Sequence, residues 1–184
     1  MFASTAFKFL ISEFEKKNIP LLVIGGFAVN IYKVNRATSD LDFLIGDGNY
    51  AKAEEVLKEA GYKEEVIGRA FARWMHPDET WIDIDFLFVS DDIFKEMFEK
   101  AQEVEIAENR FRVPCLEHLI ALKLHALKSN FVSREDIDLP DIVNLSLENQ
   151  FDLESEKSRE LCFKYGTKEL YEILLNKFKG KKNA

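Results

Sequence analysis

Residues 21–45, LLVIGGFAVNIYKVNRATSDLDFLI, decide the fold of this 184-residue chain. Residues 21–24 form a continuous apolar run, which predicts a short strand buried on both faces. Residues 40–45 alternate instead, so a strand there places Asp40 and Asp42 on one face and apolar side chains on the other. The stretch therefore predicts two strands, one of which carries two carboxylates on the same face.

Gly25 and Gly26 connect the first of these strands to a predicted helix over residues 27–34. Glycine has no Cβ, so the backbone can turn tightly there and approach a ligand closely. A helix that begins directly after such a turn offers backbone N–H groups to a phosphate. The same pair of glycines also fits an ordinary turn between a strand and a helix.

A second acidic strand is predicted over residues 81–89, WIDIDFLFV. Its alternation places Ile84 and Phe86 on one side and Asp83 and Asp85 on the other. Either aspartate could join the pair at Asp40 and Asp42. Asp85 is the preferred candidate because it begins the more continuous apolar run.

The rest of the chain predicts an α+β unit over residues 1–113, followed by a helical unit over residues 114–184. In the first unit, helices are expected at residues 5–17, 50–60 and 91–100, and strand pairs at 62–67 with 71–76 and at 104–106 with 110–113. In the second, helices are expected at residues 116–127, 139–148, 152–165 and 167–178. Pro140 would lie in the first turn of the 139–148 helix, and Asp138 would cap that helix. A polar link would precede it. The basic residues 179–184 would form a frayed tail.

Composition restricts the class of protein. The formal net charge is -8, which argues against binding nucleic acid by bulk electrostatics and fits a carboxylate-rich site that binds divalent cations. The two cysteines lack metal-binding spacing, which predicts reduced thiols and a cytoplasmic location. No signal peptide is evident, and no apolar run approaches the ~20 residues that span a bilayer, so no membrane association is expected.

The carboxylates of Asp40 and Asp42 would lie roughly 7 Å apart along their strand. Carboxylates on an otherwise apolar sheet are costly unless a positive charge neutralises them. Mg²⁺ prefers such hard oxygen ligands, and with Asp85 the three groups can hold two metal ions for phosphoryl transfer. The alternative is structural: Asp40 would cap a turn, and Asp42 would face solvent on an edge strand.

This combination resembles the nucleotidyltransferase superfamily, which has the fold of DNA polymerase β. The family pattern is a hydrophobic strand, two small residues, D-x-D and a later lone acidic residue, which correspond here to Gly25-Gly26, Asp40-Leu41-Asp42 and Asp85. Residues 36–45, RATSDLDFLI, look especially like the minimal AbiEii-type enzymes, and residues 113–127 are similar to the helix that follows their catalytic sheet. The resemblance implies an α+β fold with a mixed sheet flanked by helices.

The resemblance also implies a reaction and the residues that support it. The reaction is Mg²⁺-dependent transfer of a nucleoside monophosphate from an NTP to an acceptor hydroxyl. The metal ligands would be Asp40, Asp42 and Asp85, and Asp42 or Asp85 would also act as the base. The triphosphate would bind the backbone of Gly25 and Gly26, and further contacts to phosphate or nucleotide would come from Arg36, Thr38 and Lys123.

The acceptor stays open at this point: RNA, a protein hydroxyl or a small molecule would each satisfy the chemistry. An AbiEii-type enzyme would be the toxin of a toxin–antitoxin pair, with a cognate antitoxin as partner. The alternative is a binding module that keeps the fold but has a weak or lost active site. Gly26 departs from the pattern, because many relatives have Ser at this position.

Overall fold

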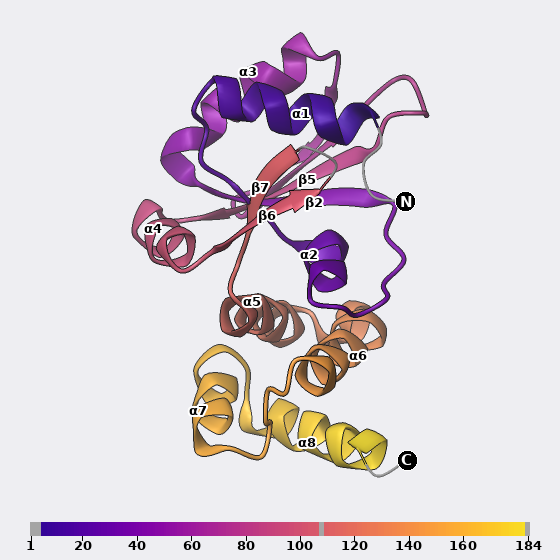
Figure 1. The fold of residues 1–184 in the computed structure, drawn as a ribbon, viewed down its shortest axis with the longest axis vertical. Helices are drawn as coiled ribbons and strands as arrows, with labels where there is room; N and C mark the ends of the chain where they lie inside the picture. The colour runs from indigo at the N-terminus through magenta and orange to yellow at the C-terminus, as the bar shows by residue number, and fades with distance from the viewer. Residues whose placement is uncertain (1–4, 107–108, 183–184) are drawn as a thin grey trace. The chain divides into compact units, whose positions relative to one another are not determined.

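The computed structural model describes residues 5–106 and 109–182 (Figure 1). The chain divides into two compact units, one of Met1–Ala28 with Arg36–Cys115 and the other of Val29–Asn35 with Leu116–Ala184. The sequence pattern predicts residues 29–35 within the sheet-containing unit. Their assignment to the helical unit has a physical basis, because the side-chain amide of Asn149 donates a 2.8 Å hydrogen bond to the backbone carbonyl of Tyr32.

The first unit is built on a five-stranded mixed sheet in the order β1-β2-β5-β4-β3. Its strands are β1 (Leu22–Val23), β2 (Asp40–Gly46), β3 (Lys63–Ile67), β4 (Phe71–Met75) and β5 (Asp83–Val89). The two acidic strands, β2 and β5, lie side by side and run parallel, whereas the other pairs in this sheet are antiparallel. The predicted α+β fold with a mixed sheet is thus confirmed.

Two helices, α1 (Thr5–Lys16) and α3 (Tyr50–Glu59), cover one face of this sheet (Figure 1). Their aromatic side chains pack against it. The ring of Phe14 in α1 meets Phe43 and Phe86 edge-on, at centroid distances of 5.5 and 6.3 Å. Tyr50 in α3 lies 5.6 Å from Phe86 and accepts a hydrogen bond from the indole of Trp74. Since side chains alternate along a strand, burying these aromatic groups directs their acidic neighbours to the opposite face.

The first unit also contains one helix that was not predicted and several elements that differ from the predictions mainly at their ends. They are the short helix η1 (Asp47–Asn49), α4 (Asp91–Glu99) and a two-stranded sheet of β6 (Gln102–Ile106) and β7 (Asn109–Val113). The connection between β6 and β7 lies outside the described residues. Helix α2 (Gly25–Ile31) starts in the first unit and ends in the second, and it begins at the glycines themselves rather than after them.

The second unit is helical, as predicted: α5 (Leu116–Ser129), α6 (Phe131–Glu148), α7 (Glu156–Tyr165) and α8 (Lys168–Lys182). The predicted polar link before residue 139 is wrong, because α6 already begins at Phe131 and Pro140 lies inside it. Asp138 is not a cap but a buried residue of this helix.

The predicted frayed tail is also wrong as far as the structure describes it. Helix α8 continues to Lys182, where the ammonium groups of Lys179 and Lys182 lie 3.2 and 3.3 Å from the carboxylate of Glu154. Within residues 5–106 and 109–182, none of the helices has the length and apolar character needed to cross a membrane.

Candidate active site

Three carboxylates from two neighbouring strands meet on the face of the sheet opposite the aromatic packing. Oxygens of Asp40 and Asp42 on β2 and of Asp85 on β5 all lie within 4.8 Å of one another. The register explains this, because Asp42 is the direct partner of Asp85 across the parallel pair. Asp83 is the register partner of Asp40, but among the described residues the three-carboxylate group contains Asp85.

Arg73 on β4 contacts two of these carboxylates and is not among the site residues predicted from the sequence. Its Nε and one terminal nitrogen donate to the two oxygens of Asp85 at 2.8 and 2.7 Å, and the same terminal nitrogen lies 3.7 Å from Asp40. The hydrogen-bonded Asp85 carboxylate raises the pKa of the Arg73 guanidinium above its ordinary value. The sequence contains one signal for this contact, namely the predicted strand pair of residues 62–67 and 71–76. Antiparallel pairing of the second of these strands with β5 sets Arg73 opposite Asp85.

Thr38 and Arg36 lie in the loop that leads into β2. The Thr38 hydroxyl donates a 2.8 Å hydrogen bond to the carboxylate of Asp40, so it orients one member of the acidic group. The Arg36 guanidinium donates to the backbone carbonyl of Ala37. Contacts from these two side chains to a phosphate or nucleotide stay predictions.

The two glycines leave room for the site. Gly25 has φ +61°, and a Cβ there would lie only 1.8 Å from the Oδ2 of Asp42. A Cβ on Gly26 would lie 2.6 Å from the Cβ of Thr38. A side chain at position 26 would therefore require Thr38 to move.

Lys123 belongs to the second unit, on α5, where it is buried. Its ammonium donates to a carboxylate oxygen of Asp138 at 2.8 Å and of Asp141 at 2.7 Å, both from α6. Arg134 lies 3.9 Å from the second oxygen of Asp138. The predicted contact between Lys123 and a nucleotide stays a prediction, and the contacts described here are ion pairs within the helical unit.

The acidic group has the donor chemistry of a divalent cation site. Three carboxylates carry a formal charge of -3, and Arg73 supplies one positive charge against them. The Asp40 and Asp85 side chains are 34% and 27% exposed, so ions and substrate can reach them. Hard oxygen ligands at this spacing fit Mg²⁺, and the residues present are sufficient to hold one or two such ions.

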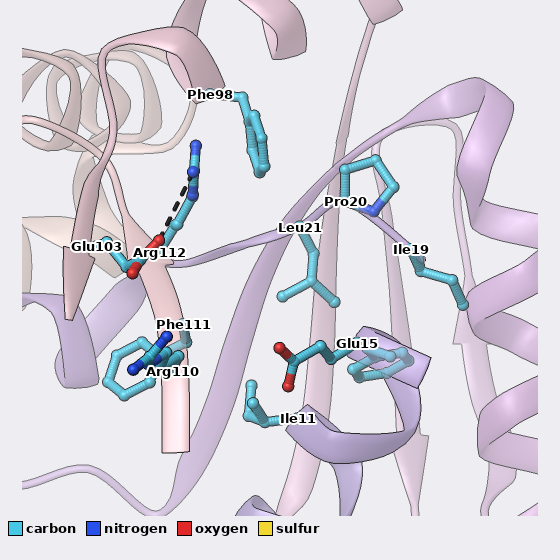
Figure 2. A pocket seen from close by; sticks show the side chains of 11 residues that line it. Ile11, Glu15, Ile19, Pro20, Leu21, Phe98, Glu103, Arg110, Phe111 and Arg112 are labelled. Atoms are coloured by element: carbon cyan, nitrogen blue, oxygen red, sulfur yellow. Dashed lines mark ion pairs between the residues drawn. The ribbon is translucent and has the colours of Figure 1, made fainter. Parts of the chain in front are cut away.

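A separate pocket of about 180 Å³ lies in the first unit (Figure 2). Apolar side chains such as Ile11, Leu21 and Phe111 line it, and an ion pair between Glu103 and Arg112 spans 3.7 Å beside it. It shares no residue with the acidic group. Pockets for drug-sized ligands usually enclose about 300 Å³ or more, so this one is small for such a ligand.

Comparison with solved structures shows which proteins share this fold. The complex of ANT(2″)-Ia with adenylyl-2″-tobramycin is 16% identical, with a TM-score of 0.59 and coverage of 96% of this chain and 97% of that one. The lincosamide antibiotic adenylyltransferase LnuA, bound to lincomycin, is 18% identical, with a TM-score of 0.58 and coverage of 78% and 96%. An antigenic nucleotidyltransferase-like protein from Paracoccidioides brasiliensis is 16% identical, with a TM-score of 0.54 and coverage of 77% and 73%.

The sequence comparisons reach further than the fold. No curated protein sequence matched the chain. A family model described as "Uncharacterised nucleotidyltransferase" matches residues 2–175, which is nearly the whole chain. This match confirms the predicted superfamily. The protein belongs to the family of uncharacterised nucleotidyltransferases and is an enzyme of nucleotidyl transfer.

Proposed function

We propose that the enzyme transfers a nucleoside monophosphate from an NTP to a hydroxyl of a small-molecule acceptor, with Mg²⁺ held by Asp40, Asp42 and Asp85. The observation that carries this proposal is the meeting of three carboxylates from adjacent parallel strands within 4.8 Å. An isolated D-x-D pair has ordinary structural explanations, but three converging carboxylates on one sheet face repel one another unless cations offset them.

In the proposed reaction the acceptor oxygen bonds to the α-phosphorus, the bond from that phosphorus to pyrophosphate breaks, and the hydroxyl proton passes to a carboxylate. Bound Mg²⁺ would offset charge on the attacking and leaving oxygens. Thr38 holds Asp40 in place by its hydrogen bond. Asp42 or Asp85 would accept the proton from the acceptor hydroxyl. The backbone of Gly25 and Gly26 would bind the triphosphate, since glycine has no Cβ to keep a ligand from its N–H group.

A small-molecule acceptor is favoured over RNA by two considerations. The structures of ANT(2″)-Ia and LnuA, which share the fold, contain an adenylylated or intact antibiotic. In addition, a net charge of -8 opposes binding of a polyanion and favours a neutral or cationic acceptor. The AbiEii-type subfamily, the toxin role and the antitoxin partner stay predictions from the resemblance.

The test uses NTPs labelled at the α-phosphate with Mg²⁺ and three acceptor sets: aminoglycosides, lincosamides and total RNA. We expect label on a small molecule with the wild type, and a loss of roughly 1,000-fold in Asp42→Asn, because a metal ion contributes several kcal/mol of transition-state stabilisation and each 1.36 kcal/mol is tenfold in rate. Asp47→Asn is the matched control, since Asp47 is an exposed aspartate outside the acidic group.

Each outcome bears on a different part of the proposal. Equal transfer by wild type and Asp42→Asn would overturn the assignment of the site. Label found only on RNA would overturn the small-molecule acceptor and leave the site intact. An NTP that binds without any transfer would favour the alternative of a binding module with a weak active site.

A further inference from the structure

The guanidinium of Arg73 places a positive charge beside two of the three carboxylates. Its guanidinium makes two hydrogen bonds, at 2.8 and 2.7 Å, that engage both carboxylate oxygens of Asp85. The same group lies 3.7 Å from an oxygen of Asp40. A bidentate pair of this kind is the strongest and most directional contact that an arginine makes with a carboxylate.

This geometry conflicts with metal binding at Asp85. An oxygen that accepts a short hydrogen bond from a guanidinium directs its electron density to that donor and cannot also lie at bonding distance from Mg²⁺ along the same direction. A divalent ion also repels a guanidinium a few ångströms away, by the same Coulomb interaction that attracts it to the carboxylates. A divalent ion at Asp85 would therefore compete with Arg73 for the lone pairs of the two carboxylate oxygens and repel its guanidinium.

We propose that Arg73 is a positioning residue that acts on the metal site through Asp85: it offsets part of the negative charge before metal binds, competes with the divalent ion, and moves off Asp85 when the ion arrives. The proposal rests on the proposed function in one respect, namely that the three carboxylates bind a divalent ion. The 41% exposure of the Arg73 side chain leaves it free to move without disturbing the core.

The test is a Mn²⁺ titration, followed by calorimetry and by loss of the free-ion electron paramagnetic resonance signal. We expect Arg73→Gln to bind Mn²⁺ roughly tenfold more tightly than wild type, because a unit positive charge about 4 Å away opposes a second cation even when strongly screened. The matched control is Arg69→Gln, which removes the same charge from an exposed residue of the loop between β3 and β4 and should stay within about twofold of wild type.

Affinity that is equal or weaker in Arg73→Gln would overturn the proposal while leaving the metal site in place. No Mn²⁺ binding by wild type, Arg73→Gln or Arg69→Gln would instead overturn the proposed metal site itself.

A second measurement needs no substitution and covers the case in which Arg73→Gln fails to fold. The Nε–H resonance of Arg73 in the ¹⁵N-labelled wild type should shift as Mg²⁺ is added, since the group loses its carboxylate partner. Asp42→Asn, which weakens the metal site without touching the Arg73–Asp85 pair, should need more Mg²⁺ for the same shift. An Arg73 resonance that stays constant as Mg²⁺ saturates the site would overturn the release of Asp85.

Discussion

The residues around the acidic site are packed so closely that a single added Cβ atom at Gly25 would displace the neighbouring Asp42 side chain. Gly25 has a positive φ, and its missing Cβ leaves the space in which the Asp42 carboxylate lies. Thr38 and Arg73 then hold Asp40 and Asp85 by hydrogen bonds of 2.7 to 2.8 Å. The positions of the three carboxylates thus depend on their immediate neighbours as well as on the strands that carry them.

Gly25→Ala should lower the free energy of unfolding by about 1–3 kcal/mol, the usual cost of a strained backbone position, and should displace Asp42. Mn²⁺ affinity should fall together with stability, because the new Cβ would lie 1.8 Å from the Asp42 oxygen. Urea unfolding and Mn²⁺ titration measure the two effects. Gly180→Ala is the matched control: a Cβ there meets nothing within 4 Å, so we expect stability to rise by about 0.5–1 kcal/mol. Mn²⁺ affinity that is unchanged in Gly25→Ala would contradict the prediction.

At the scale of elements, α5 and α6 are joined by a buried cluster of charges. Lys123 on α5 lies between Asp138 and Asp141 on α6, and all three are at least nine-tenths buried. An interior proline such as Pro140 costs a helix one hydrogen bond and a steric clash. We infer that tertiary contacts such as these ion pairs offset that cost and allow α6 to continue through Pro140.

Lys123→Met should lower the free energy of unfolding by about 3–5 kcal/mol, because two buried carboxylates lose their cation. Restoring neutrality with Asp138→Asn and Asp141→Asn in the same chain should recover much of this loss. Lys128→Met, on the exposed side of α5, should change stability by no more than about 0.5 kcal/mol. Thermal unfolding compares these proteins, and equal losses for Lys123→Met and Lys128→Met would argue against the ion pairs as stabilising contacts.

The same variants examine the predicted nucleotide contact of Lys123. If its role is confined to the helical unit, the triple variant should fold and keep wild-type affinity for NTP. Restored stability with lost NTP binding would instead support the contact that the family resemblance implies. Fluorescence titration with a labelled nucleotide separates these results.

For the whole molecule, buried groups in both units make stability depend on pH in the alkaline range. Burial raises the pKa of the Cys162 thiol to about 11 from an ordinary value of 9.0. Burial also raises the pKa of the Tyr50 and Tyr62 hydroxyls in the first unit. These groups hold their protons more tightly in the folded than in the unfolded chain. Their contribution to the free energy of unfolding is therefore fully present below pH 9 and is lost as the pH rises.

We expect Cys162 alone to contribute a loss of about 2–3 kcal/mol between pH 9 and pH 11, since each unit of pKa shift corresponds to 1.36 kcal/mol. Urea unfolding at pH 7, 9 and 11 measures the loss. Cys162→Ala should be less stable at pH 7 but should lose less stability with pH, and Cys115→Ala should follow the wild type. A pH dependence that is the same in all three proteins would contradict this assignment.

Local patterns predicted much of this architecture. The alternation in β2 and β5 is visible in residues 40–45 and 81–89, and it correctly separated the aromatic face from the acidic face. The predictions failed where a long-range contact outweighed a local signal. Asp138 before Pro140 has the pattern of a helix start, but burial against Lys123 places both residues inside one long helix.

The sequence by itself determined which residues could form the acidic site: side chains alternate along a strand, so Asp40 and Asp42 had to share a face, and Gly25 and Gly26 marked a close approach of the backbone. Only the tertiary structure decided that β2 lies parallel to β5, that Asp42 and Asp85 are register partners, and that Arg73 pairs with Asp85. The reason is physical. Periodicity depends on neighbouring residues, whereas strand order and register depend on how segments tens of residues apart bury their apolar faces together.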